Sequence, residues 1–136
     1  MTTISPTIEA RGIILPALKA DAATITLIPA ARLYPSKTPN NPVKPFGRYG
    51  AENVEPERYA GWRGGAVSTA YHVFVGTTAA IPDAKAHCEK AVAAIADVLD
   101  ALPDCYVDRT QILEDGAEAD VWHGVVMFTF TAIDQP

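Results

Sequence analysis

Residues 66–75 read AVSTAYHVFV, and this stretch decides the predicted fold. Its larger side chains occupy every second position, as in a β-strand that turns one face toward a hydrophobic core. The face that we expect to be buried consists of Val67, Thr69, Tyr71, Val73 and Val75. The other face carries Ala66, Ser68, Ala70 and His72. The middle of the chain is therefore predicted to form a half-buried strand of a sheet.

Downstream of this strand the sequence predicts a long amphipathic helix over residues 83–102. Pro82 and Asp83 are typical of a helix start, and Pro103 ends the helix because proline cannot continue it. The apolar stripe consists of Cys88, Ala91, Val92, Ile95, Leu99 and Leu102. At about 1.5 Å per residue this helix spans roughly 30 Å, which is enough to cross a small sheet.

The C-terminal residues are predicted to form a long hairpin that closes the domain. Residues 106–113 have the mixed polarity of a strand, and residues 114–120 form an acidic turn around Gly116. Residues 122–132 predict a second strand with strict alternation. Its aromatic side chains are expected to face the core, with Trp122, Phe128 and Phe130 on that side.

The N-terminal residues predict a helix. Ser5 and Pro6 are typical of a helix start, and the apolar pattern continues to about Ala20. Pro16 is expected to kink or divide this helix, because proline removes an amide donor and clashes with the preceding turn. Residues 22–33 show no single period, so no element is predicted there.

Two irregular segments follow. Residues 35–45 contain four prolines and are predicted to be a loop or an extended arm. A short strand is expected over residues 46–50. Residues 52–65, with Pro56 and a Gly-Gly pair, are predicted to be a second long connection. Long connections in a compact domain are uncommon and tend to be functional.

The chain of 136 residues has the size and composition of one domain, since 49% of its residues are hydrophobic and no linker divides it. We predict a single α+β domain over residues 1–136. The apolar runs are too short to span a membrane, and the N-terminus lacks the pattern of a signal peptide. We therefore expect a soluble protein that is made in the cytoplasm and has no membrane partner.

The formal net charge is −5. This balance argues against a protein whose main task is to neutralise nucleic-acid phosphates, because such binding needs clustered Lys and Arg. No nucleic-acid-binding module is recognisable either. DNA is therefore expected to pass nearby without being bound specifically.

No pattern supports catalysis or cofactor binding. His72, His87 and His123 lack the spacing of metal-binding motifs, and the glycine patterns of phosphate loops and nucleophile elbows are absent. Cys88 follows His87 on a predicted helix, where adjacent side chains point about 100° apart, so a buried cysteine is favoured over a nucleophile. We predict no enzyme, no metal and no cofactor, with Cys88 and Cys105 as two free, mostly buried thiols.

Three short stretches connect the order of these elements to a known family. They are RLYP at residues 32–35, YHVFV at 71–75 and WHGVVMF at 122–128. Together with the element order, they resemble the tail-completion, or tail-terminator, proteins of tailed bacteriophages over nearly the whole chain.

This resemblance implies a mostly antiparallel mixed sheet with helices packed on one face and long loops that act as assembly arms. It implies a structural virion protein, in a phage or a related particle such as a gene transfer agent, that forms a ring, commonly of six subunits, at the head-proximal end of the tail tube. Such a ring ends tube polymerisation and joins the tail to the head. The implied partners are other copies of the chain, the tail tube protein and the head-completion or connector protein, with DNA passing through the lumen.

Three segments hold the residues that we expect at protein contacts. The proline-rich arm contributes Tyr34, Pro35, Lys37, Pro39 and Asn40. The second connection contributes aromatic and cationic side chains of the kind enriched at interfaces, namely Arg58, Tyr59, Trp62 and Arg63. The acidic turn contributes Glu114 and Asp115. The alternatives are a local turn at the second segment and a solvated hairpin tip at the third.

Two other functions are weighed against this one. Another neck component, such as a head-completion or adaptor protein, is also a small ring-forming subunit. A ligand-binding or enzymatic α+β domain would need a site assembled from Arg63, His72, His123 and nearby carboxylates, which no sequence spacing supports.

Overall fold

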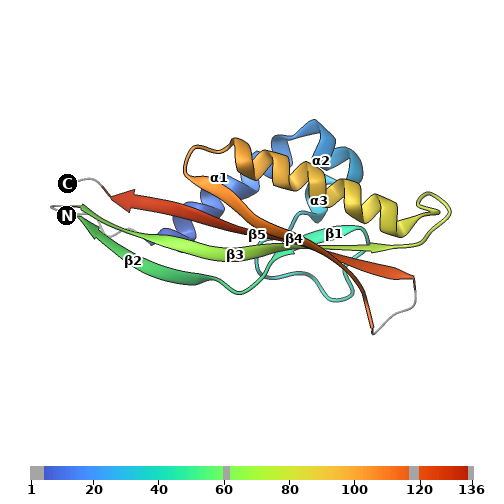
Figure 1. Cartoon of the computed structure of the whole chain (residues 1–136). Coiled ribbons are helices and arrows are strands. Elements are labelled where there is room, and N and C mark those ends of the chain that lie inside the picture. The colour runs from blue at the N-terminus through green and yellow to red at the C-terminus, as the bar shows by residue number, and fades with distance from the viewer. Residues whose placement is uncertain (1–4, 60–61, 117–119, 135–136) are drawn as a thin grey trace.

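The computed structural model describes residues 5–59, 62–116 and 120–134 as a sheet with helices packed against it (Figure 1). The helical elements are α1 (Pro6–Ala20), α2 (Ala22–Leu27), the single 3-10 turn η1 (Ala30–Arg32) and α3 (Ala84–Ala101). The strands are β1 (Phe46–Tyr49), β2 (Asn53–Tyr59), β3 (Trp62–Gly76), β4 (Cys105–Glu114) and β5 (Val121–Asp134). The predicted α+β class is confirmed.

All five strands pair in antiparallel fashion, in the order β1-β3-β5-β4. Strand β2 also pairs with β3, on the same side as β1: Tyr49 lies opposite Tyr71, and Asn53 lies opposite Ser68. The two strands are thus successive parts of one broken edge, with residues 50–52 between them. The sheet therefore has two different edges, β1 with β2 on one side and β4 on the other.

The core lies between this sheet and the helices. Helices α1 and α3 pack on one face of β3 and β5. None of α1, α2 and α3 covers the opposite face of the sheet (Figure 1). The predicted buried face of β3 is confirmed, because Val67, Tyr71, Val73 and Val75 are fully buried and Thr69 is 8% exposed. The predicted apolar stripe of α3 is buried as well, apart from the partly exposed Leu102.

Gly124 of β5 allows α3 to approach the sheet closely. A Cβ atom at this position would lie 2.9 Å from Sγ of Cys88 and still closer to Val92. The helix therefore packs directly over the backbone of β5. Burial in this layer raises the pKa of the Cys88 thiol to about 12, and burial with nearby carboxylates raises that of Cys105 to about 12. The prediction of two free, buried thiols is confirmed.

The predicted second connection over residues 52–65 is wrong. Residues 53–59 form β2, and β3 begins at Trp62, four residues earlier than predicted. Pro56 lies opposite Gly65 on an edge strand, where a missing amide donor does not break a ladder on both sides. The proline and the glycine pair therefore fit an edge hairpin as well as a loop.

The N-terminal region also differs from the prediction in two places. Helix α1 continues through Pro16 as one helix, held by the fully buried side chains of Ile14 and Leu18. Residues 22–27, for which no element was predicted, form α2. The Asp21 carboxylate caps α2 by accepting hydrogen bonds from the backbone amide of Thr24 at 3.0 Å and from its hydroxyl at 2.7 Å. Residues 35–45 contain no helix or strand, as predicted.

The packing of α3 predicts a large effect of truncating its buried stripe. Leu99 has no exposed surface, so Leu99→Ala should lower the free energy of unfolding by about 2 to 5 kcal/mol. Val43 is 60% exposed, and Val43→Ala should change it by less than about 0.5 kcal/mol. Urea unfolding of both variants measures the difference. Equal effects would contradict the assignment of α3 to the core.

Candidate assembly surface

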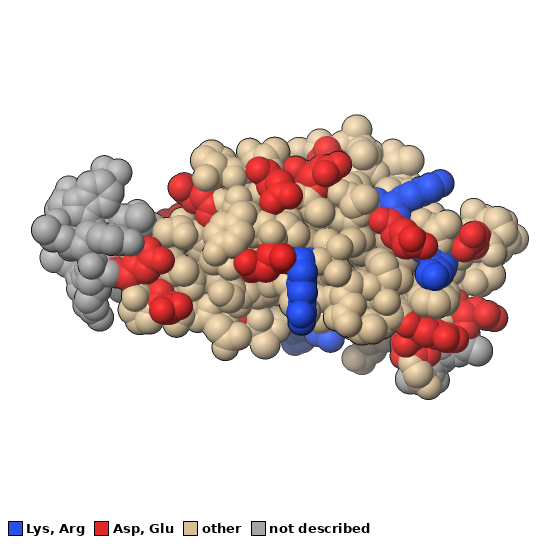
Figure 2. Space-filling model, viewed as in Figure 1, with Lys and Arg blue, Asp and Glu red and all other residues tan. Residues whose placement is uncertain are grey.

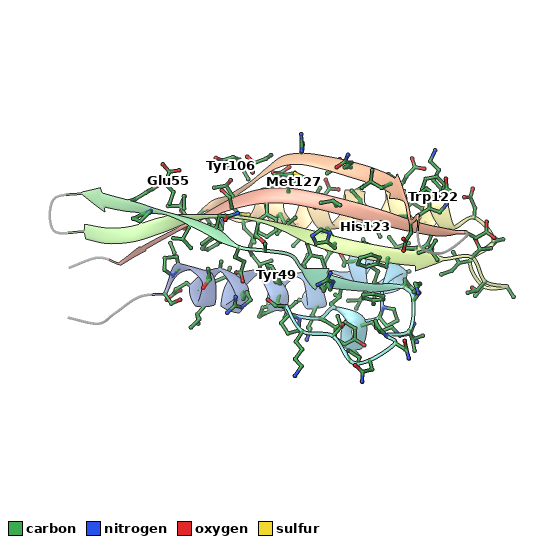
Figure 3. All side chains as sticks on the ribbon, turned by 90° about the horizontal axis from the view of Figure 1, so that it is seen from below. Tyr49, Glu55, Tyr106, Trp122, His123 and Met127 are labelled. Carbon is green, nitrogen blue, oxygen red and sulfur yellow. The ribbon has the colours of Figure 1, made fainter. Side chains whose placement is uncertain are left out.

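The proline-rich segment, residues 35–45, lies outside β1 at one edge of the sheet (Figure 3). Its first end is fixed to the sheet by three contacts. The Tyr34 amide donates to the Gly47 carbonyl at 2.8 Å, the Tyr71 hydroxyl donates to the Tyr34 carbonyl at 3.2 Å, and Leu33 forms a parallel bridge with Gly47. The segment is therefore tied to the fold at its base while its middle faces outward.

The outward part of this segment contains most of the contact residues predicted for it. Pro35, Lys37, Pro39 and Asn40 are exposed, and Tyr34 is partly buried. Exposed proline in a segment with fixed ends has little conformational freedom to lose on binding, which favours a docking role.

A row of rings crosses the uncovered face of the sheet from the proline-rich segment to β5. The rings of Tyr34 and Phe46 lie 6.2 Å apart, those of Phe46 and Phe74 stack at 4.9 Å, and those of Phe74 and His123 stack at 4.3 Å. His72 extends the row, with its ring 4.9 Å from that of His123. Figure 3 shows His123 on this face. The row is partly apolar and has no helix over it, with Phe46 buried and the other rings partly buried.

His72 and His123 share a hydrogen bond between Nδ1 and Nε2, with the atoms 2.7 Å apart. One ring donates and the other accepts, which requires a neutral acceptor. Burial, the neighbouring His123 and Arg48 lower the pKa of His72 to about 4. Burial also lowers the pKa of His123, helped by Arg48 and opposed by Asp115. Both rings are therefore neutral at pH 7.

A shallow hollow of about 410 Å³ lies beside this row on the same face. Its lining includes the small side chains of Ser68 and Ala70 and the larger ones of Arg109 and Met127. Arg109 Nε lies 3.1 Å from the Met127 sulfur. Residues of β2, β3, β4 and β5 therefore contribute to this hollow.

The acidic turn lies at the opposite edge of the sheet. Glu114 ends β4 opposite Trp122, and the Asp115 amide donates to the Val121 carbonyl at 2.8 Å. Asp120, the residue before β5, has a positive backbone φ of 59°. Glu118, which belongs to the predicted acidic turn over residues 114–120, lies outside the described residues.

The third predicted group lies at the end of the β2–β3 hairpin. Arg58 pairs with Arg63 and Tyr59 with Trp62, so these residues belong to strands and not to the predicted loop. Their side chains lie outside the described part of the structure. The three predicted groups are thus placed at three separate positions, the β1 edge, the β4–β5 turn and the β2–β3 end. Phe46 and Phe74 were not among the predicted contact residues; Phe46 is buried and Phe74 is partly buried on the helix-free face.

The alternative of a metal or catalytic site gains no support from the geometry. The structure brings His72 and His123 together, but among the described residues no group of three or more His, Cys, Asp or Glu side chains is placed to hold a metal ion. His87 lies elsewhere, with its Nε2 2.8 Å from the Leu27 carbonyl oxygen.

The family model for tail completion protein gp17 matches residues 13–132, which is most of the chain. The chain belongs to the tail completion protein gp17 family. As a member of this family it is a structural protein of a bacteriophage-type tail, located in the virion, and not an enzyme.

The fold of this tail completion protein is also similar to that of a solved virion protein. A chain from the virion of a native gene transfer agent particle superimposes with a TM-score of 0.77 over 97% of this chain and 100% of that chain, at 16% identity. A search of curated protein sequences found no significant match. Among the described residues, no helix has the length and apolar character needed to cross a membrane.

The histidine pair of this tail protein predicts a pH-dependent stability. Because the folded state lowers the pKa of His72 to about 4 from an ordinary value near 6.5, the unfolded state binds more protons between these values. The contribution of His72 is complete above about pH 6.5 and is lost as the pH falls toward 4.

Unfolding free energies measured between pH 7 and pH 5 test this. The wild type should lose more stability over that range than His72→Gln, which cannot titrate. Parallel curves for the two proteins, or an NMR titration that puts His72 near its ordinary pKa, would contradict the assignment.

Proposed function

We propose that this protein forms a closed ring, of six subunits, at the head-proximal end of the tail tube, where it ends tube polymerisation and joins the tail to the head connector. The observation that carries the proposal is the family membership, since the matched family consists of tail completion proteins. The partners are then other copies of the chain, the tail tube protein and the head-completion or connector protein.

The two unlike edges of the sheet support a ring. A contact between the β1 edge of one subunit and the β4 edge of the next uses two different surfaces, so it is a head-to-tail contact. Contacts of this kind generate a ring when the rotation closes. The proline-rich segment, tied to β1 at its base and exposed at Lys37 and Asn40, is placed to reach a neighbour.

The net charge of −5 is compatible with a conduit for DNA. Carboxylates repel phosphate, so an acidic ring lets DNA slide through its lumen without holding it. In this proposal the protein acts by association, and DNA binding contributes nothing to its task.

Assembly of particles with and without this protein tests the proposal. With the protein present, tails should have one uniform length and join heads, and native mass spectrometry of tail ends should detect a ring of its subunits. Without it, tubes should continue past that length and stay headless. Uniform, joined tails in its absence, or a single subunit per particle, would refute the proposed role.

Shortening the proline-rich segment separates assembly from folding. Replacing residues 36–43 with a brief Gly-Ser link should leave cooperative thermal unfolding in place, because the core elements do not include these residues. Ring closure or tail completion should be impaired. Leu99→Ala provides the opposite control, since it weakens the fold without touching the segment. Normal rings and normal tails from the shortened protein would show that the segment is only a surface loop.

A further inference from the structure

The charges of this chain are divided unequally along the sequence. Between Asp21 and Glu52 there is no Asp or Glu, and the cations are Arg32, Lys37, Lys44 and Arg48. From Asp97 to Asp120 the opposite holds, because Arg109 is the only cation. The acids of that stretch are Asp97, Asp100, Asp104, Asp108, Glu114, Asp115, Glu118 and Asp120.

The fold places these two stretches at opposite edges of the sheet. The basic stretch includes β1 and the proline-rich segment, and the acidic stretch includes the end of α3, β4 and the β4–β5 turn. Figure 2 views the molecule from the side of α3 and β4, where acidic side chains outnumber basic ones. Figure 3 shows β1 and the proline-rich segment along one margin of the sheet and β4 along the other.

Strand β1 lies level with residues 110–113 of β4, directly before Glu114, whereas Asp104 lies level with Glu55 of β2, farther along the same edge as β1. One cross-strand row runs from Phe46 through Phe74 and His123 to Leu113. The edge strands β1 and β4 are therefore connected across the sheet without an offset. The next row also connects β1 to β4, through Gly47, Val73, Gly124 and Ile112. A rotation about an axis parallel to the strands therefore brings the basic edge of one copy to the acidic edge of the next.

Apolar side chains accompany the charges at both edges. Val43 of the proline-rich segment is 60% exposed, and Leu113 of β4, which directly precedes Glu114, is 40% exposed. Each edge thus offers an exposed apolar side chain beside charges that are mainly of one sign, with Lys85 over the Trp122 ring as a cation at the acidic edge.

We infer that the basic edge, defined by Arg32, Lys37 and Arg48 with the proline-rich segment, docks on the acidic edge, defined by β4 and the β4–β5 turn, of a second copy of this chain. The inference rests on the proposed ring and names the surfaces that build it. Complementary charge fixes which edges meet and at what level, and like edges repel one another. Head-to-tail growth follows, and edge-to-edge dimers of two β4 strands are disfavoured.

Charge reversal at one edge at a time tests the pairing. In the basic-edge variant, Arg32→Glu is combined with Lys37→Glu; in the acidic-edge variant, Gln111→Lys is combined with Glu114→Lys. Lys37, Gln111 and Glu114 are exposed, and Arg32 lies on a short surface turn, so folding should be retained. Circular dichroism and thermal unfolding check this before assembly is measured.

Each variant alone should associate about tenfold or more weakly than the wild type, because every junction then places like charges opposite each other. An equal mixture of the two variants should restore rings in which they alternate, since every junction is again complementary. A single chain with all four changes should also form rings. Native mass spectrometry resolves the alternating composition.

The possible outcomes distinguish a failure of the charge pairing from a failure of the proposed ring. Rings from the wild type together with unimpaired rings from both single-edge variants would overturn the charge pairing and leave the proposed ring intact. No ring from the wild type, alone or on tail tubes, would instead overturn the proposed function. Failure of the mixture and of the four-change chain, with folded subunits, would also overturn the pairing.

Discussion

The structure depends on the pairing of β3 along its whole length. This 15-residue strand pairs with β5 from Arg63 to Gly76 on one side, and with β1 and β2 on the other. Because its side chains alternate, the same pairing buries Val67, Tyr71 and Val73 under the helices and turns Phe74 and His72 to the uncovered face. A slip of one residue would exchange the two faces, so the core and the row of rings on the helix-free face are fixed together.

This constraint also determines where the molecule is open. With β3 and β5 in the middle, the sheet ends in β1 and β2 on one side and in β4, from the closing hairpin, on the other. Exposed edges pair with other chains unless they are covered or charged. Here β1 is flanked by the proline-rich segment and cations, β2 on the same side carries Glu55 and Glu57, and β4 on the other side is flanked by carboxylates. These flanking groups limit non-specific strand pairing with other chains. A directional contact between unlike edges remains possible.

Much of this fold could be predicted from the sequence because its longest elements have strong periods. The alternation of residues 66–75 and the stripe of α3 each repeat over enough residues to identify the element and its buried face. Helix α2 has only six residues and one cap at Asp21, which gives no usable period. Strand β2 was missed because Pro56 is typical of loops and becomes acceptable only at an edge, which is a property of the whole sheet.

The surface was less predictable than the core for the same reason. His72 and His123 are far apart in sequence and meet only because β3 and β5 pair in one register. The stacking of Phe46 on Phe74 likewise depends on β1 joining that strand. Composition alone did indicate that Lys37, Asn40 and Glu114 are solvated, and these side chains are exposed, while their role at contacts stays a prediction. That the proline-rich segment and the acidic turn lie on opposite edges of the sheet could be inferred only from the strand order.

Cryo-electron microscopy of completed tails tests the central claim most directly, at a resolution that traces the backbone of the tail end. The account predicts a closed ring of this protein at the head-proximal end of the tube, with β1 and residues 35–45 of each subunit against β4 and the acidic turn of the next. A tail end without such a ring, or a ring whose subunits meet through other surfaces, would contradict it.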